Sequence, residues 1–310
     1  MEDDECLNAG YGSNLTFEGT VECDSAIMSG NGHFGAVGAL SGVRNPISVA
    51  RRILERSTET SVIGRVHPMM LVSAGAHAFT EQEGQAVSSP DKMVCPRAKM
   101  EWEYWRAQLA DATSGAQIMQ EDGLADTVGA VAFCWEIGAK VQQIDVAAGV
   151  SSGGILLKPS GRVGGAAIFG AGCWASRRVA VSVSGTGEQI IRESLARNLG
   201  EAVEKCSGCV GSDALDTHEE IERVMNKFRE ACAARGDTDA NAGAIVLVSE
   251  GDNEEHGEHF RPRAYCSFTT HSMAIGYTAT SMSKSKTIIL KQDDSHQTAV
   301  YISGFSLSDG

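Results

Sequence analysis

The sequence predicts an α+β fold of sheets and covering helices, and three observations indicate it. The chain has 310 residues, 42% of them hydrophobic, which is enough to form a large core. Strand-like runs come in neighbouring pairs with helical patterns between the pairs, unlike the strict alternation of a parallel doubly wound sheet. The 35 glycines, against only 6 prolines, gather where those runs end, which indicates many tight turns around sheets.

The first half predicts a loop, two strands and a helix. Pro46 favours a helix start, because the N–H that proline lacks would have no partner in the first turn. Within that helix Ile47, Ala50 and Leu54 share a face. The predicted ranges are 8–14 (NAGYGSN) for the loop, 21–28 and 34–41 for the strands, and 46–56 for the helix.

A long exposed connection is predicted next, over residues 80–125. Pro90, Pro96 and polar residues interrupt the hydrophobic pattern there, although 101–109 (EWEYWRAQL) has some amphipathic character. Regular patterns return from residue 127 onward. They predict a strand pair at 127–133 and 145–152, a strand at 179–184, helices at 187–198 and 217–234, and late strands at 243–249, 263–269, 274–280, 287–291 and 298–304.

Charge and cysteine usage narrow the functional class. The formal net charge is −14, so the surface potential would repel phosphate backbones and we expect no nucleic-acid partner. No run of about 18 apolar residues is present, so we expect no membrane span. The nine cysteines are irregularly spaced, as in reduced intracellular proteins. We therefore expect an intracellular protein of the cytoplasm, the nucleus or both.

Thr127 is the first residue whose position suggests chemistry. A hydroxyl is a weak nucleophile, but a threonine that becomes the first residue of a chain can use its own α-amino group as the base. This needs a threonine at a strand start behind an exposed, cleavable segment, and Asp126-Thr127 meets both conditions. From position alone, a plain first strand residue is the favoured interpretation of Thr127.

Ordered motifs downstream distinguish these two interpretations. After TVGAV at 127–131 come VSSGG, PSGRVG, GAGCW and VSGTGE, at 150–154, 159–164, 170–174 and 183–188. Together they resemble the plant-type asparaginase and threonine aspartase family of N-terminal-nucleophile hydrolases. In the first half, NAGYGS at 8–13, ECD at 22–24 and FGAVGALSG at 34–42 resemble the threonine aspartase (taspase) branch in particular.

The resemblance implies roles for the residues around the nucleophile. Thr127 would attack the Asp126 carbonyl in self-cleavage, and afterwards the bond of a substrate. Ser152, the second serine of VSSGG, would lie beside Thr127 and tune it. Ser184 and Gly185 would supply a hydroxyl and a backbone N–H facing the developing oxyanion. No metal and no organic cofactor is expected, because nucleophile and base belong to one residue.

The substrate is implied by three further positions. Arg162 would bind a substrate carboxylate as a bidentate fork, and Gly187 would permit close approach of backbone. Small-substrate asparaginases carry an aspartate after G-R-V-G that pairs with the substrate α-ammonium, whereas this chain has Gly165. A protein substrate has no α-ammonium at the cleaved bond, so the sequence favours an endopeptidase that cuts after Asp. The alternatives are an asparaginase or isoaspartyl peptidase, and a truncated or inactive relative.

The family fold implied is a four-layer αββα sandwich in a single domain, 1–310. Residues 1–126 would form the alpha-subunit segment and 127–310 the beta-subunit segment, with a possible homodimer of such protomers. Family members usually have a strand, a Gly-rich turn and a helix before the loop that starts here at Asn8. We therefore expect the family's first strand and helix to be absent.

Two other clusters carry weaker signals. Cys206 and Cys209 (CSGC) have the spacing of a redox or metal pair, but no second pair lies at a suitable distance. His256 and His259 lie in an acidic run that is more typical of solvated surface. Gly185-Thr186-Gly187 is too short for a dinucleotide-binding loop.

Overall fold

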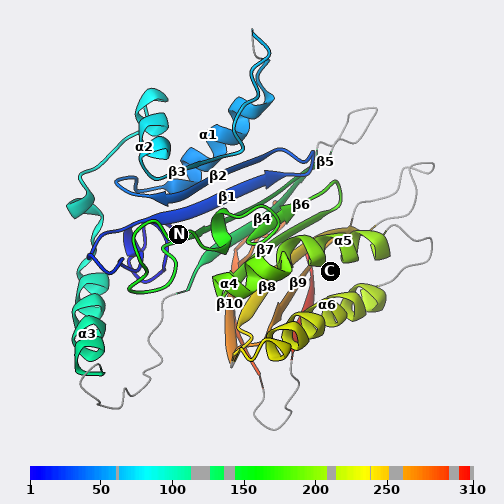
Figure 1. Cartoon of the computed structure of the whole chain (residues 1–310). Helices are drawn as coiled ribbons and strands as arrows, with labels where there is room; N and C mark the ends of the chain where they lie inside the picture. The colour runs from blue at the N-terminus through cyan, green and yellow to red at the C-terminus, as the bar shows by residue number, and fades with distance from the viewer. Residues whose placement is uncertain are drawn as a thin grey trace. The chain divides into compact units, whose positions relative to one another are not determined.

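The computed structural model describes residues 1–60, 63–112, 126–135, 144–207, 214–237, 239–250, 261–292 and 300–307. Within these ranges the chain has a mixed α+β fold with several sheets and six α-helices (Figure 1), as the sequence predicts. The fold is consistent with the expected sandwich of the N-terminal-nucleophile type. Within the same ranges, no helix is long and apolar enough to cross a membrane.

The first sheet contains five strands in the order β3-β2-β1-β5-β4. Strands β2 and β3 run parallel, with Val37 opposite Leu71. The central strands come from distant parts of the chain, which brings the end of β5 beside β1. The bounds are Cys23–Ser29 (β1), Phe34–Leu40 (β2), Met70–Val72 (β3), Val128–Trp135 (β4) and Ile144–Ser152 (β5).

Two helices pack against β2: α1 (Pro46–Thr58) and α2 (Ser73–Gln82). Val49 and Ile53 of α1 meet Val37 of β2 in an apolar cluster. A Cβ on Gly35 would lie 2.1 Å from the Ala50 carbonyl oxygen, so only glycine lets the helix approach this closely. The buried residues of α1 are Pro46, Val49, Ala50 and Ile53. Ile47 and Leu54 of the predicted shared face are half-buried, and they lie against Gly149 and Gly35 of the sheet.

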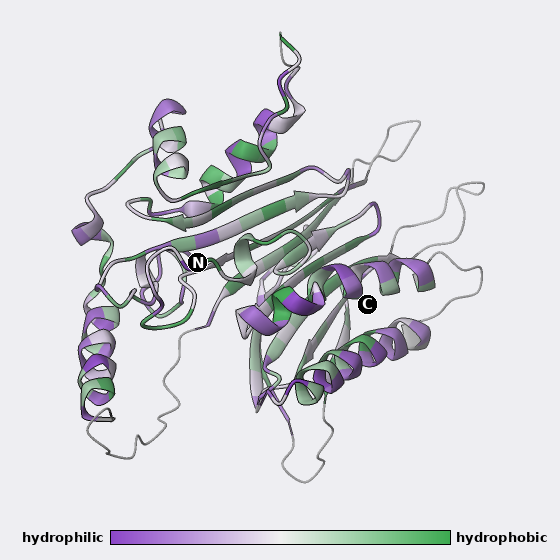
Figure 2. Cartoon of the chain, in the orientation of Figure 1, coloured by the Kyte–Doolittle hydropathy of each residue, from purple (hydrophilic) through white to green (hydrophobic). Residues whose placement is uncertain are grey.

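The second five-stranded sheet is antiparallel, in the order β12-β9-β8-β7-β6. Two helices with both polar and apolar faces, α5 and α6, pack against it (Figures 1 and 2). Leu195, Leu199 and Val203 recur at helical spacing on the buried side of α5. The bounds are Cys173–Ala175 (β6), Val179–Gly185 (β7), Ala242–Glu250 (β8), Arg261–Phe268 (β9), Tyr301–Ser306 (β12), Leu195–Ser207 (α5) and Ala214–Ala234 (α6).

One predicted helix is broken in two. The pattern at 187–198 predicts a single helix, but the structure has α4 (Gly187–Glu193) and then α5. Ser194 lies between them in the left-handed region, with φ 44° and ψ 50°, and its N–H donates to the Ile191 carbonyl. Non-glycine residues rarely adopt this conformation, so the serine at this position gives no signal in the sequence that the helix breaks here.

A separate antiparallel sheet has two strands, β10 (Ser272–Tyr277) and β11 (Lys286–Lys291).

The predicted exposed connection contains regular, partly buried structure. A short 3₁₀ helix, η2 (Pro90–Met93), is followed by the 17-residue helix α3 (Pro96–Ala112). Met93 and Cys95 are buried in a cluster with Leu15. Both prolines stand at helix starts, where proline is tolerated, and so they do not interrupt the helices. The expectation of an exposed segment was therefore wrong at Met93, Cys95 and Ala98, while 113–125 lie outside the described residues.

The chain divides into two compact units by its internal contacts. Unit 1 comprises residues 1–27, 33–129 and 149–169. Unit 2 comprises residues 28–32, 130–148 and 170–310.

Candidate active site

Thr127 and Ser152 share a hydrogen bond of 2.7 Å between their hydroxyl oxygens. Thr127 immediately precedes β4 and is half-buried, and Ser152 is the last residue of β5, which neighbours β4 in the sheet. Strand pairing thus brings together two hydroxyls that are 25 residues apart in the chain. The structure places the predicted nucleophile and the serine expected beside it in contact within unit 1.

The turn after β5 orients the Ser152 hydroxyl. The Gly154 N–H donates to Ser152 Oγ at 3.0 Å, which fixes this oxygen beside Thr127 Oγ1. Gly154 has φ 72°, in the left-handed region, and Gly153 has no room for a side chain: a Cβ there would lie 2.4 Å from Asn8 Oδ1. The two glycines of VSSGG are therefore required by backbone shape and by close packing.

Arg162 lies against this same turn. Its Nη1 is 2.9 Å from where a Cβ on Gly154 would be, and 2.6 Å from the corresponding point on Gly164. Two glycines thus make the space in which the guanidinium lies. Arg162 is partly exposed. The predicted carboxylate-binding residue is therefore close to the serine that bonds the predicted nucleophile.

Two buried charges support the Arg162 loop. Lys158 is fully buried, and its Nζ donates to the Glu22 carbonyl at 2.6 Å. Asp24 is also fully buried and accepts the N–H groups of Ala39 at 2.9 Å and Gly164 at 2.7 Å. Burial raises the pKa of the Asp24 carboxyl, while the positive charge of Lys158 and the two N–H bonds oppose that rise. Asp24 therefore fixes the backbone next to Arg162.

Gly165 follows directly as the first residue of a buried 3₁₀ turn, 165–167. No acidic side chain stands at this position, and its φ is not positive, so other residues can adopt its backbone conformation. The position at which the sequence analysis expects an aspartate in small-substrate enzymes is thus close to Arg162 in the chain and in unit 1.

Asn8 connects the bond before Thr127 to the same turn. Its N–H donates to the Asp126 carbonyl oxygen at 2.9 Å, and its Nδ2 donates to the Gly154 carbonyl at 2.8 Å. Asn14 Nδ2 reaches that same carbonyl at 3.0 Å. Asp126 itself is exposed as a residue, although neighbouring protein atoms crowd its carboxyl and raise the carboxyl pKa.

Ser184, Gly185 and Gly187 lie in unit 2, at the end of β7 and the start of α4. Gly185 has φ 139°, and a Cβ there would lie 2.1 Å from the Asn241 carbonyl oxygen, so the strand can turn here only with glycine. The structure brings these three residues together at one sharp bend. Their participation in the same site as Thr127 stays a prediction.

Four residues of the unit 1 site were not predicted from the sequence: Asn8, Asn14, Asp24 and Lys158. Asn8 and Asp24 belong to the motifs NAGYGS and ECD, and those motifs are the only signal that could have found them. Lys158 could not be expected, because lysine is rarely fully buried. The weaker metal candidates Cys209, His256 and His259 lie outside the described residues.

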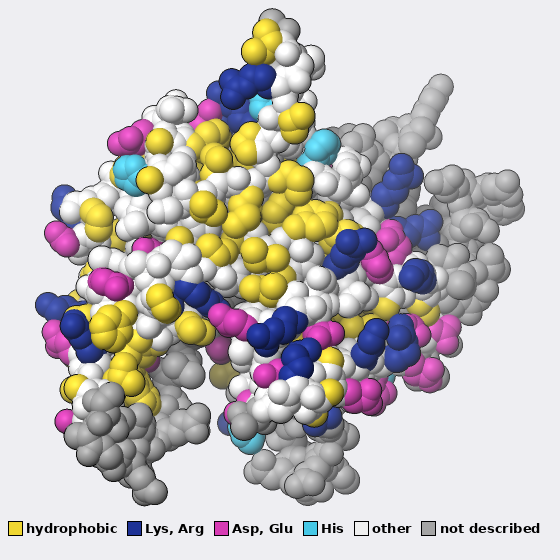
Figure 3. Space-filling view, viewed as in Figure 1, with side chains coloured by type: hydrophobic (Ala, Val, Ile, Leu, Met, Phe, Trp, Pro, Cys, Tyr) yellow, Lys and Arg dark blue, Asp and Glu magenta, His cyan; other side chains and the backbone are white. Residues whose placement is uncertain are grey.

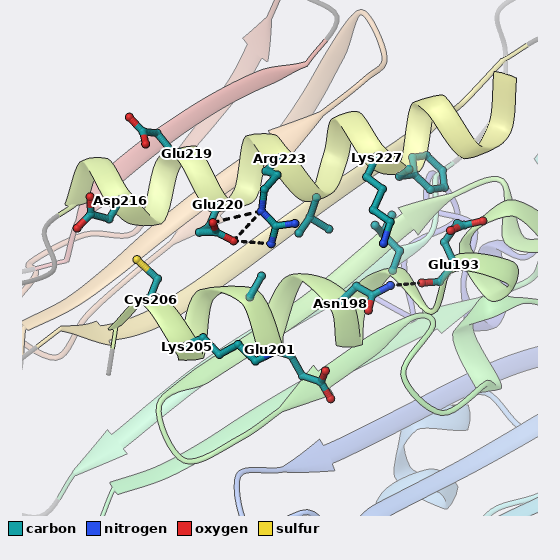
Figure 4. Close-up of a pocket in the computed structure, with 14 residues that line it drawn as sticks. Glu193, Asn198, Glu201, Lys205, Cys206, Asp216, Glu219, Glu220, Arg223 and Lys227 are labelled. Atoms are coloured by element: carbon teal, nitrogen blue, oxygen red, sulfur yellow. Dashed lines mark hydrogen bonds and ion pairs between the residues drawn. The ribbon is translucent and has the colours of Figure 1, made fainter. Parts of the chain in front are cut away.

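A cavity of about 580 Å³ lies elsewhere, between α5 and α6 of unit 2 (Figure 4). It is lined by charged side chains of both signs, among them the ion pair of Arg223 with Glu220 at 2.6 Å. Acidic and basic side chains are also intermixed on the surface of these helices (Figure 3). None of the predicted site residues lines this cavity, and its described lining includes no serine or threonine hydroxyl.

A mixed α+β fold with a threonine at a strand start is consistent with the N-terminal-nucleophile hydrolases that the motifs resemble. The chain belongs to the asparaginase family. The model of that family, described as Asparaginase (Asparaginase_2), matches residues 1–252.

Relatives of the chain include enzymes with two related names. A plant-type L-asparaginase of Pyrococcus furiosus is 35% identical over 237 residues, 74% of this chain and 69% of the relative. An isoaspartyl peptidase of Salmonella typhimurium is 37% identical over 79% of this chain and 70% of the relative. An isoaspartyl peptidase/L-asparaginase of Xenopus laevis is 35% identical over 81% and 71%. Against the plant-type enzymes of Pyrococcus horikoshii and Pyrococcus abyssi, the matched part spans 63% of the relative's length.

Proposed function

We propose that the chain is a threonine-nucleophile hydrolase that cleaves itself between Asp126 and Thr127 and then hydrolyses amide bonds of aspartyl compounds. The observation that carries this proposal is the 2.7 Å hydrogen bond between Thr127 Oγ1 and Ser152 Oγ. Thr127 directly follows Asp126, whose carbonyl it would attack. Membership of the asparaginase family supports the same chemistry.

The freed Thr127 would act on a substrate with its own amine as base. The amine accepts the hydroxyl proton while Oγ1 attacks the substrate carbonyl, and the leaving amine receives that proton. Ser152 accepts a hydrogen bond from Gly154 and so keeps Oγ1 in a fixed direction. Arg162 would orient the substrate through a carboxylate, and the bend at Ser184 and Gly185 is proposed to face the oxyanion.

The first candidate substrate class is asparagine or an isoaspartyl peptide. Relatives with these names align over three quarters of the chain or more, including the segment that carries Arg162. Both substrates present a free α-carboxylate of the kind a guanidinium binds in a bidentate manner. Hydrolysis would then release aspartate from a small molecule.

The second candidate is an endopeptidase that cuts protein substrates after Asp, and Gly165 favours it. A small aspartyl substrate brings an α-ammonium, for which Gly165 offers no carboxylate. A protein substrate has none, so no buried charge is left without a partner. Arg162 would then bind the aspartyl side chain before the cleaved bond, as Asp126 is placed before Thr127.

One set of assays separates the two candidates. Purified protein is incubated with asparagine, with a β-aspartyl dipeptide, and with a peptide that repeats the residues around Asp126. Thr127→Ala is the control in each. Hydrolysis of the first two compounds supports the small-substrate enzyme, and cleavage only of the peptide supports the endopeptidase. Activity that persists in Thr127→Ala would contradict both.

Gly165→Asp sharpens the distinction. In an endopeptidase the new carboxylate repels an aspartyl side chain, so peptide cleavage should fall about tenfold or more in kcat/KM. In a small-substrate enzyme the carboxylate gains the α-ammonium as a partner, so KM for asparagine should fall. Gly165→Ala is the matched control, because it adds a side chain without charge.

A further inference from the structure

We infer that the hairpin of β10 and β11, residues 272–291, binds an acidic, extended segment of a protein substrate that precedes the cleaved bond. This rests on the proposed function, because it assigns a docking surface to the endopeptidase, the second candidate. Three observations on the described residues carry it. The hairpin is basic, its outer face is apolar at the centre, and it begins beside the bend at Ser184 and Gly185.

The hairpin is basic in a chain that is acidic overall. Residues 261–292 contain five lysines and arginines and no aspartate or glutamate, whereas the whole chain has a formal net charge of −14. Lys284, Lys286 and Lys291 are exposed, and none of the three forms an ion pair with a residue that the structure describes. Lys286 lies over the Tyr277 ring, 5.8 Å from its centre. An anionic partner would therefore meet positive charge that no described carboxylate balances.

The two faces of the hairpin differ. Met273 and Leu290 lie on the inner face and pack in an apolar cluster with residues of β9 and β12. Side chains alternate across a strand, so Ile289 points to the outer face, where it is 65% exposed. Its partner across the hairpin is Ala274, which is too small to cover it, and the neighbouring Ile288 is 42% exposed. An apolar side chain of a bound segment can lie here, between the flanking lysines.

The hairpin also has main-chain groups at its edges. The two strands pair from Ser272 opposite Lys291 to Tyr277 opposite Lys286. Neither strand pairs with any other strand in the described part of the chain. An edge of this kind can take an added strand, whose main chain supplies affinity while its side chains meet those of the sheet. The hairpin can therefore hold an extended segment along the six residues of β11.

The base of the hairpin lies next to the bend proposed to face the oxyanion. Gly185 is paired with Ala242 of β8. The Thr269 N–H donates to the Ala242 carbonyl at 2.9 Å, and the Ala242 N–H donates to Thr269 Oγ1 at 2.9 Å. The Met273 sulfur is 3.4 Å from where a Cβ on Gly243 would be, so β10 begins beside β8 (Figure 1). All these residues belong to unit 2, and a segment held along the hairpin would lead toward the bend.

Charge favours an acidic segment over a second copy of the chain. The segment before the proposed cleavage bond, 119–126 (MQEDGLAD), has three acidic residues and no basic one. In the proposed function it is the first segment that the enzyme cuts. In a symmetric contact between two copies, the same lysines would face each other across the paired strands, where like charges are destabilising.

Binding is measured apart from cleavage, on the full-length uncut Thr127→Ala chain. That chain also carries Glu121→Gln and Asp122→Asn, so that its own segment does not compete. The probe is a fluorescein-labelled peptide of sequence 119–126, followed by fluorescence anisotropy, and a second peptide with the same two substitutions is its neutral analogue. The acidic peptide should bind about tenfold more tightly than the analogue, and this advantage should shrink as salt is added.

Two pairs of lysine variants locate the surface. Lys286→Glu/Lys291→Glu should raise the Kd of the acidic peptide about tenfold and remove its advantage over the neutral analogue. Lys92→Glu/Lys99→Glu changes the charge by the same amount at exposed positions of unit 1, and should leave Kd within about twofold. The inference is overturned if both pairs shift Kd equally, or if neither does.

Two other occupants would give different results. An oligothymidylate of the same net charge is added as a competitor, and size-exclusion chromatography follows the oligomeric state. Displacement of the probe by the oligothymidylate as effectively as by unlabelled acidic peptide would mean a general polyanion surface. A dimer that Lys286→Glu/Lys291→Glu dissociates would mean an interface between copies. Either result would overturn the inference.

Turnover by the self-cleaved protein separates this inference from the proposed function. Acidic and neutral peptides that extend past the bond, of sequence 119–132, are compared. The acidic peptide should have the lower KM, and Lys286→Glu/Lys291→Glu should abolish that difference without changing kcat or self-cleavage. Equal KM values in wild type would overturn the inference alone. A wild-type chain that never cuts itself would overturn the proposed function, and the anisotropy titration would still decide the inference.

Discussion

Unit 1 and unit 2 have different interiors. Among the described residues, the buried carboxylates and ammonium, those of Glu2, Asp24 and Lys158, all lie in unit 1. Unit 2 buries mainly apolar side chains, which recur at helical spacing on α5 and α6 and follow one another along β7. Buried charges cost free energy unless they are paired. The buried charges of unit 1 therefore lower its stability while they fix polar groups around Thr127. The core of unit 2 is mainly apolar.

The largest effect should come from Asp24→Asn in unit 1. Asparagine would turn an NH₂ group toward one of two N–H donors, and Lys158 would lose the nearby negative charge. We expect a loss of about 3–5 kcal/mol in the free energy of unfolding, measured by urea titration. Glu220→Gln in unit 2, which breaks a partly exposed ion pair with Arg223, should cost under about 1 kcal/mol. Similar losses in the two variants would refute the contrast between the units.

Next in size is Leu199→Ala, which tests unit 2 as an apolar scaffold. Leu199 is 0% exposed on the inner face of α5, so its loss should cost roughly 3 kcal/mol by leaving a cavity. The rate of self-cleavage should stay unchanged at a temperature where the variant is folded. A large fall in that rate would mean that the unit 1 site depends on this part of unit 2.

The smallest effect concerns pH and Glu2. Burial raises the pKa of Glu2 above its usual 4.5, and hydrogen bonds from Ser151 and the Ile47 N–H only partly oppose this. The stability due to this raised pKa is fully present below pH 4.5 and is lost as pH rises through the folded-state pKa. Wild type should therefore lose stability relative to Glu2→Gln across that window. The unfolding free energies of the two proteins are compared by urea titration at a series of pH values on both sides of that window. If wild type instead became more stable than Glu2→Gln as pH rises, the predicted direction of the effect would be wrong.

The same contrast explains what the sequence could predict. Apolar periodicity located α6 and the strand β8 of unit 2 within a few residues, because burial there is repetitive and local. The contact of Thr127 with Ser152 was predicted only through the order of the motifs. Asn8 was missed because its role depends on bonds to residues far along the chain, such as Gly154, 146 positions away. Lysine is rarely fully buried, so no sequence pattern could predict the burial of Lys158.

The most direct test of Thr127 as the nucleophile is the intact mass of the purified chain over time, beside Thr127→Ala. Wild type should separate into two fragments that meet at Asp126 and Thr127 and together weigh one water more than the whole chain, while the variant stays intact. A folded wild-type chain that remains whole, or a variant that is cut at the same bond, would contradict the assignment.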